Sequence, residues 1–264
     1  MKLPAFQHPG LLRDVIGWDI GNWQQALGLW DSLLPRRLDG WRGLELGAQR
    51  GGLSLYFGLR GAQMICSDYA SPRQLAEPLH RHYGVKAEYA AVDACRPLPF
   101  ASSSLDLVCF KSVLGGIRKA ARHDPKPGLI GEITRVLRPG GWLLLAENLQ
   151  GSALHQLLRR RFVSWSQGWE YLSESEILSL LTGFELEHAS TGLLALLGRS
   201  EAQRRWLGRL DAQLSPHVPD AWHYLFMGAA RKPIAQSIGS EVKLAHLEPR
   251  TNLETNPQSK EQNP

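Results

Sequence analysis

Short apolar runs alternate with amphipathic segments along most of the chain. Five runs predict strands, and several of these are continuously apolar, as parallel strands covered on both faces must be: "WRGLELG", "AQMICSD", "KAEYAAVD", "LDLVCF" and "GWLLLAEN". Three segments between them predict helices: "GGLSLYFGLRG", "SPRQLAEPLHRHYG" and "PGLIGEITRVLRPGG". We expect Ser71 to cap the second helix, with Pro72 in its first turn, and Pro139, Gly140 and Gly141 to stop the third. This alternation predicts an α/β fold with a mostly parallel sheet.

Further elements are expected on both sides of this region. Residues 1–36 predict a helical N-terminal extension, with Asn22 as N-cap and four apolar side chains at helical spacing: Trp23, Leu27, Trp30 and Leu34. After the fifth strand the pattern predicts helices near 152–165, 173–181 and 200–213 and a strand near 184–191. "AWHYLFMGAARK" predicts a final strand, which brings the sheet to seven. Residues 233–264 are polar and irregular, which predicts a disordered tail.

Composition narrows the class of protein only slightly. The 264 residues suffice for one α/β domain with additions, and the net charge of +5 permits an anionic partner without arguing for one. Three widely spaced cysteines, Cys66, Cys95 and Cys109, fit neither a disulfide framework nor a zinc site. We expect buried, reduced thiols and therefore a cytoplasmic location. The sequence shows neither a signal-peptide pattern nor an apolar run long enough to span a bilayer.

Acidic and small residues follow the first three strands. The first strand ends in Glu45 and the glycine-rich loop 47–52, and Asp68 ends the second strand, 21 residues after Gly47. Asp93 ends the third strand. In a doubly wound sheet, ligands bind at the carboxyl ends of the strands, and an acidic side chain at this spacing reaches the hydroxyls of an adenosine ribose. The order of these residues therefore predicts a nucleotide site, although a single strand-end aspartate is more often a cap.

The spacing of the glycines distinguishes between two candidate nucleotide ligands. A dinucleotide fingerprint requires a central glycine beside the pyrophosphate, and Gln49 stands there instead. S-adenosylmethionine has no phosphate and makes no such demand. The chain here resembles the class I S-adenosylmethionine-dependent methyltransferases, type-11-like, whose first motif reads E/D-x-G-x-G-x-G; the middle glycine is replaced. The resemblance covers about residues 40–150 and continues through Asp68, "VDACRPLPFASSSLDLVCFKSVL" and "EITRVLRPGGWLLLAEN".

The resemblance implies a Rossmann-like fold with helices on both faces of the sheet, S-adenosylmethionine as co-substrate and no metal. It implies an extension at 1–36, a methyltransferase domain at 37–232 whose segment 150–215 covers the acceptor, and the tail at 233–264. Asp68 would hold the ribose and Asp93 the adenine amino group. The predicted donor-binding residues are Glu45, Gly47, Ala48, Gly51, Asp68, Tyr69, Asp93, Ala94 and Lys111. Glu45 is expected beneath the loop, with Gly47 and Gly51 approaching the donor and Gln49 and Arg50 turned away.

The acceptor side is less determined. Methyl transfer needs an acceptor held in line and, for a hydroxyl, removal of a proton, so the candidates for catalysis are Lys111, Glu147 and His155. Each has an ordinary structural alternative as a loop lysine, a capping carboxylate or a packed histidine. Similarity to a bacterial subgroup implies a small-molecule or glycan acceptor, with a hydroxyl oxygen preferred and an amine or a lipid-linked molecule as alternatives. By analogy with relatives, Trp18 and Asp19 would close over the donor.

The segment 154–165 carries an apolar stripe with Arg161 inside it. Its arginines either interact with solvent at the helix C-terminus or form a basic lid that contacts an anionic acceptor or a membrane surface. Two features argue against nucleic acid as the methyl acceptor. Phe110-Lys111-Ser112-Val113 stands where a base amino-methyltransferase carries its motif, and Cys109 lacks the preceding proline of a cytosine C5 nucleophile. A non-catalytic protein that binds S-adenosylmethionine is the second rival, supported by the substituted glycine. The sequence leaves the oligomeric state open.

Overall fold

The computed structural model describes residues 10–117, 124–153, 155–157 and 169–234. The helices are α1 (Leu11–Ile16), α2 (Ile20–Leu33), α3 (Gly52–Leu59), α4 (Arg73–His82), α5 (Lys126–Val136), α7 (Glu174–Leu180) and α8 (Glu201–Leu214). The strands are β1 (Arg42–Leu46), β2 (Gln63–Asp68), β3 (Ala87–Ala91), β4 (Leu105–Lys111), β5 (Leu137–Asn148), β6 (Glu185–Thr191) and β7 (Leu225–Arg231). Short 3₁₀ turns follow β4 (η2, Leu114–Gly116) and β6 (η4, Ala195–Leu197) and precede the start of β7 (η5, Ser215–His217; η6, Asp220–Trp222).

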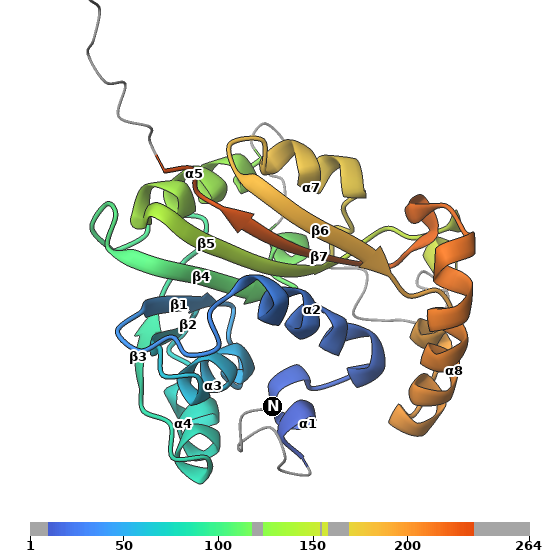
Figure 1. The fold of residues 1–264 in the computed structure, drawn as a ribbon, viewed down its shortest axis with the longest axis horizontal. Helices are drawn as coiled ribbons and strands as arrows, with labels where there is room; N and C mark the ends of the chain where they lie inside the picture. The colour runs from blue at the N-terminus through green and yellow to red at the C-terminus, as the bar shows by residue number, and fades with distance from the viewer. Residues whose placement is uncertain (1–9, 118–123, 154, 158–168, 235–264) are drawn as a thin grey trace, which may run out of the picture. The chain divides into compact units, whose positions relative to one another are not determined.

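The strands form one seven-stranded sheet in the order β3-β2-β1-β4-β5-β7-β6. The first five strands pair in parallel, whereas β7 lies antiparallel between β5 and β6 (Figure 1). This arrangement confirms the predicted α/β, Rossmann-like, mostly parallel sheet. Because the parallel strands end at one edge, the residues after β1, β2, β3, β4 and β5 gather there. In the described part of the chain, no helix is long and apolar enough to cross a membrane.

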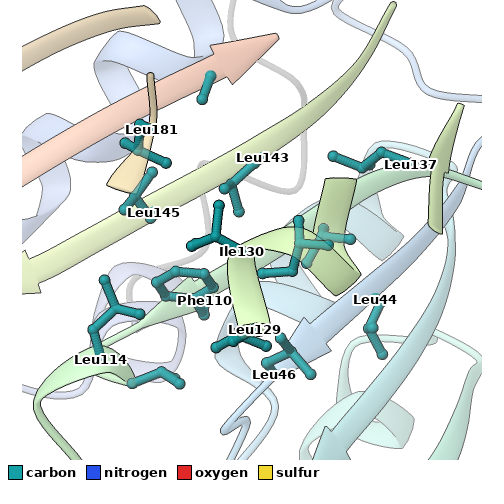
Figure 2. Packing of buried hydrophobic residues seen from close by; sticks show 14 of the residues in the cluster. Leu44, Leu46, Phe110, Leu114, Leu129, Ile130, Leu137, Leu143, Leu145 and Leu181 are labelled. Carbon is teal, nitrogen blue, oxygen red and sulfur yellow. The ribbon is translucent and has the colours of Figure 1, made fainter. Parts of the chain in front are cut away.

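Alternation along the strands divides the core into two layers. In β4, Val108 and Phe110 pack with α5 and α7 on one face of the sheet, while Leu107 and Cys109 pack with α2 and α3 on the other. Figure 2 shows the first layer, where Phe110 lies close to Leu129 and Ile130 of α5. Both faces of the central strands are therefore buried, which explains why their sequences read as continuous apolar runs.

The N-terminal helix α2 is part of this core. Trp23 and Trp30 are almost completely buried, and Trp30 Nε1 donates to the Gly228 carbonyl of β7 at 3.0 Å. The prediction that Asn22 caps the helix is wrong, since α2 begins after Asp19, which adopts a left-handed φ of 46°. Asn22 is instead buried in the first turn, where its Nδ2 donates to Asp211 and Tyr224. Tertiary hydrogen bonds thus outweigh the capping preference of this asparagine.

Several other boundaries differ from the predictions. Helix α5 ends at Val136 and not at Pro139–Gly141, because Leu137 already pairs with Leu105 of β4 and begins β5. Helix α4 begins after Pro72 without a side-chain cap, so Ser71 does not cap it. The last strand starts at Leu225, after the 3₁₀ turn η6, and not at Ala221. Helices α7 and α8 match the predicted ranges, whereas most of the predicted helix 152–165 and the tail lie outside the described residues.

Candidate functional site

A cavity of about 650 Å³ opens at the carboxyl ends of the parallel strands. Strands β1, β2 and β4 and the loop after β3 contribute Glu45, Leu46, Gly47, Ala48, Asp68, Tyr69, Val92, Asp93, Ala94, Cys95, Lys111, Ser112 and Val113. Other parts of the chain contribute Arg13, Asp14, Val15, Ile16, Gly17, Trp18, Gln49, Arg50, Gly52, Leu53, Gly116, Ile117, Asn148 and Trp169. The cavity therefore contains every predicted donor-binding residue except Gly51. Lining the cavity does not establish what a residue binds, so the donor-binding roles stay predictions.

Glu45 lies beneath the loop that follows β1. Its carboxylate accepts hydrogen bonds from the backbone N–H groups of Leu53, at 3.1 Å, and Ser54, at 2.7 Å, in the first turn of α3. Burial raises the pKa of the Glu45 carboxyl to about 7. A buried carboxyl at this point satisfies helix N–H groups that have no intrahelical partner, and it holds the loop in the position that a ligand would meet.

The loop after β1 differs from the expectation at Gly51. Gly51 does not line the cavity: a side chain there would come within 2.6 Å of His80 Nε2 and 2.9 Å of Cys66 Sγ, and its φ is +73°. Glycine is thus required at this position by packing beneath the loop and by the left-handed backbone. Gln49 and Arg50 are exposed and are among the residues that line the cavity, and the expectation that they turn away from the donor stays a prediction.

Asp68 connects β2 to the same loop. One carboxylate oxygen accepts from the Gln49 backbone N–H at 2.8 Å, and the other accepts from the Tyr69 backbone N–H at 2.7 Å. Asp93 accepts from the Cys95 backbone N–H at 2.9 Å and lies 3.3 Å from Arg96 Nε. Both aspartates therefore have fixed orientations at neighbouring strand ends, and both line the cavity.

The N-terminal segment 13–18 lies across one side of the cavity. The carbonyl oxygen of Val15 lies so close to Gly52 that a side chain at position 52 would come within 2.2 Å of it. Lys111, at the end of β4, donates from Nζ to the Ile16 carbonyl at 2.6 Å and lies 4.8 Å from the centre of the Trp23 ring. Burial lowers the pKa of Lys111 to about 8. Lys111 and Gly52 together hold this segment against the domain.

Trp18 and Asp19, both predicted to close over the donor, have different surroundings in the structure. Trp18 lines the cavity, whereas Asp19 is completely buried and accepts a hydrogen bond from the Tyr224 hydroxyl at 2.5 Å. Burial raises the pKa of Asp19 to about 6. Asp19 thus links α2 to β7 and does not contact the cavity. Trp18 therefore lies at the cavity wall and Asp19 in the core, because the chain turns into α2 directly after them.

Glu147 is completely buried and is not among the residues that line the cavity. Its Oε1 accepts from the backbone N–H groups of Val113, at 2.5 Å, and Leu114, at 2.8 Å. Burial raises the pKa of this carboxyl to about 7. The proposed role as a general base is therefore corrected to a positioning role, in which Glu147 orients the turn after β4 where Ser112 and Val113 meet the cavity.

His155 is also buried and lies outside the cavity lining. Its Nδ1 accepts from the Ser152 backbone N–H at 3.0 Å, and its Nε2 lies within hydrogen-bond distance of the Leu193 carbonyl. With Nδ1 accepting, Nε2 carries the proton and donates to that carbonyl. Neither nitrogen is free to receive a proton from an acceptor molecule, so the general-base hypothesis for His155 is corrected to a structural link.

Replacing His155 with glutamine tests this correction. We expect the turnover rate and its pH profile to stay within about threefold of the unchanged protein, because no proton transfer passes through this side chain. We also expect a loss of roughly 1–2 kcal/mol in the free energy of unfolding, because a buried hydrogen-bond network is disturbed. Methyl-transfer rates across pH and denaturant titrations measure the two quantities. A turnover rate reduced by roughly two orders of magnitude, with stability unchanged, would instead support His155 as a general base.

Three further cavity residues carried little sequence signal. Asn148 is the last residue of β5, and its Nδ2 donates to Ser112 Oγ at 3.0 Å. Arg13 lies in the N-terminal segment, and Trp169 follows the predicted helix 152–165. Each enters the cavity from a part of the chain whose position depends on tertiary packing. The arginines at 159–161, proposed for a lid, lie outside the described residues.

A smaller cavity, of about 230 Å³, lies beside α7 and Lys126. Lys126 is almost completely buried, with Nζ 2.6 Å from Glu170 and 3.5 Å from Asp124. Its charge is therefore balanced by neighbouring carboxylates, and its pocket does not include the strand ends. No cluster of side chains suited to a metal ion occurs among the described residues.

Comparison with known proteins agrees with this geometry. Residues 44–145 match the family described as "Methyltransferase domain". The chain is also 29% identical over 177 residues to the biotin biosynthesis bifunctional protein BioHC of Cellvibrio japonicus, which covers 67% of this chain. The chain spans about a third of the length of that curated relative, because the match covers 32% of it.

Solved structures show the same fold. An S-adenosylmethionine-dependent methyltransferase of Methanosarcina mazei aligns with a TM-score of 0.56 at 22% identity, covering 78% of this chain and 97% of that one. Phosphoethanolamine N-methyltransferase 2 of Haemonchus contortus, bound to phosphomonomethylethanolamine and S-adenosylhomocysteine, aligns with a TM-score of 0.54 at 22% identity. That match covers 80% of this chain and 53% of the other. At these identities the structural likeness concerns the fold alone.

Proposed function

We propose that this chain, which contains a class I S-adenosylmethionine-dependent methyltransferase domain, transfers a methyl group from S-adenosylmethionine to a small-molecule acceptor. The observation that carries the proposal is the position of Glu45, Asp68 and Asp93, which lie at the ends of successive strands or just after them and line one cavity. Asp68 would accept from the ribose hydroxyls and Asp93 from the adenine amino group. The sulfonium methyl is already activated, so the protein chiefly holds the acceptor in line with it.

We prefer an oxygen as the methylated atom. Of the three residues proposed for catalysis, only Lys111 lines the cavity, and its Nζ is engaged by the Ile16 carbonyl. Among the lining residues that the structure describes there is no histidine. An acidic hydroxyl, such as a phenol, ionises with little help and therefore suits this cavity better than a sugar hydroxyl. A glycan hydroxyl and an amine are the alternatives.

The body of the acceptor is expected to be partly apolar. Trp18, Ile117 and Trp169 line the cavity, and Asn148 adds a polar group at the end of β5. Aromatic walls with a few polar groups are typical of sites that bind small organic molecules. Trp169 belongs to the segment 150–215 that we propose as the acceptor cover; α7 and β6, in the same segment, belong to the body of the fold.

We place the activity in the cytoplasm because of the state of the cysteines. Cys66 and Cys109 are free and buried, as reduced thiols are expected to be. Cys95 is also free, but it is exposed, contrary to expectation.

Calorimetry followed by a transfer assay tests the proposal. We expect both S-adenosylmethionine and S-adenosylhomocysteine to bind with 1:1 stoichiometry. Incubation with S-adenosylmethionine and matched sets of phenols, sugars and amines is expected to produce S-adenosylhomocysteine and a product heavier by one methylene group. Failure to bind either nucleotide would overturn the function, and product from amines alone would overturn the preference for oxygen.

A protein that binds S-adenosylmethionine without catalysis is the second candidate, since Gln49 replaces the middle glycine of the loop. Gln49 is exposed, and a cavity of about 650 Å³ stays open behind it. A side chain that blocked the donor would close this space, so the geometry favours the enzyme. Tight nucleotide binding without product from any acceptor class would favour the second candidate.

A further inference from the structure

The outward face of α8 has an unusual composition. Arg205, Trp206 and Arg209 share one side of the helix at spacings of three and four residues, and Trp206 is 60% exposed. The opposite side of α8 carries Asp211, which is completely buried. The exposed Trp206 therefore lies beside two exposed arginines, which places apolar area and positive charge on the same face of the helix.

The acidic residues of α8 do not neutralise this face. Glu201 accepts from the backbone N–H groups of Asp19, at 3.1 Å, and Ile20, at 2.9 Å. Asp211 accepts from the backbone N–H group of Leu194 at 2.7 Å. Both carboxylates thus join α8 to the rest of the domain, and the outward side is left with positive charge only.

Two exposed residues lie just before the helix begins. Leu197 is 43% exposed, and Arg199 is exposed. The α8 surface is defined here as Leu197, Arg199, Arg205, Trp206 and Arg209. None of its three arginines forms an ion pair with any residue that the structure describes. Their charges are therefore available to an external anionic partner.

Helix α8 faces the cavity wall with its inward side. The guanidinium of Arg204, on that side, lies 5.7 Å from the centre of the Trp18 ring, and Trp18 lines the cavity. Figure 1 shows α8 outside the sheet and beside α2. Arg204 and Asp211, seven residues apart, share the inward side, so the outward face of Arg205, Trp206 and Arg209 points away from the N-terminal segment.

We propose that the α8 surface docks on an anionic lipid surface. Arginines without ion-pair partners match anionic headgroups, and each basic residue near such a surface adds favourable electrostatic energy. Tryptophan and leucine contribute apolar area at the boundary between headgroups and chains, where an indole is favoured. An acidic protein would also match the charges, but exposed apolar side chains set among arginines favour lipid.

Co-sedimentation with lipid vesicles tests the proposal with the full chain. At low salt we expect binding to vesicles of phosphatidylcholine with about 30% phosphatidylglycerol and little binding to phosphatidylcholine alone. The double variant Arg205→Glu, Arg209→Glu is expected to bind the anionic vesicles at least roughly tenfold more weakly. Trp206→Ala keeps the charge and is expected to weaken binding about threefold. The matched control is Arg81→Glu, Lys86→Glu, which makes the same charge change at two exposed residues, on α4 and just after it.

Each outcome of this experiment supports or overturns the proposal. Equal loss in the α8 variant and the control would mean that net charge alone attracts the vesicles, which overturns the proposal. Absence of vesicle binding by the unchanged protein, or equal binding to neutral vesicles, overturns it as well. Calorimetry with S-adenosylmethionine on all variants is expected to give unchanged affinity. Absence of S-adenosylmethionine binding by the protein without substitutions would refute the methyltransferase proposal, and the vesicle result would stand independently of it.

Discussion

Replacement of Asp68 by alanine is expected to weaken S-adenosylmethionine binding by at least about 100-fold. The carboxylate already accepts from the Gln49 and Tyr69 backbone N–H groups, and in the complex it would also accept from the ribose. Hydrogen bonds to a charged group contribute about 1.5–3 kcal/mol each, so the loss of two from the ligand exceeds a factor of about 100. Calorimetric titration with S-adenosylmethionine measures the effect directly.

Glu88→Ala is the matched control for this change. Glu88 lies on β3, next to β2, but its side chain is 73% exposed and it does not line the cavity. We expect its removal to change nucleotide affinity by less than about twofold. An Asp68→Ala protein that is folded and binds the donor within about threefold of the unchanged protein would contradict the assignment of Asp68 to the ribose.

Replacement of Gly52 by alanine is expected to destabilise the domain by about 2–3 kcal/mol, as overpacking of a tight contact does. The added methyl group would come within 2.2 Å of the Val15 carbonyl oxygen, which belongs to the backbone and cannot rotate away. The N-terminal segment must therefore move from α3, which also removes the Ile16 carbonyl from Lys111. Denaturant titration measures the stability, and limited proteolysis within residues 10–19 reports the release of the segment.

Gly28 provides a control with the opposite expected sign. It lies on the exposed side of α2, and a side chain there would meet nothing within 4 Å. Gly28→Ala is therefore expected to stabilise the protein by about 0.5–1 kcal/mol, since alanine has the higher helix propensity. Equal effects of the two substitutions would contradict the close contact between α1 and α3.

The edge that carries the proposed donor site was predictable because its residues follow a local rule. Glu45, Asp68 and Asp93 each end a strand or follow it closely, and parallel strands joined by helices bring those ends to one edge of the sheet. Hydrophobic periodicity was enough to find the strands, and the order of acidic residues was enough to indicate the edge. The exception is Gly51, whose role depends on His80 packing beneath the loop.

The acceptor side was not predictable to the same degree. Glu147 lies at the end of the fifth strand and His155 follows it, as catalytic residues would, but their partners come from elsewhere in the chain. Glu147 turns toward the Val113 backbone, 34 residues away, and His155 toward Leu193, 38 residues away. Whether a polar side chain faces a cavity or satisfies a buried backbone group depends on such distant partners, which no local pattern encodes.

The sequence alone determined the class of fold and indicated the strand edge that carries the proposed site, and both follow from period and spacing within strand–loop–helix units, where chain connectivity limits the geometry. The kind of nucleotide came from the resemblance of the glycine loop and the following motifs to a known family. The tertiary structure decided which residues wall the cavity. The contact between Lys111 and Ile16 spans 95 residues, and it places the N-terminal segment over the site because a buried ammonium group must find an acceptor.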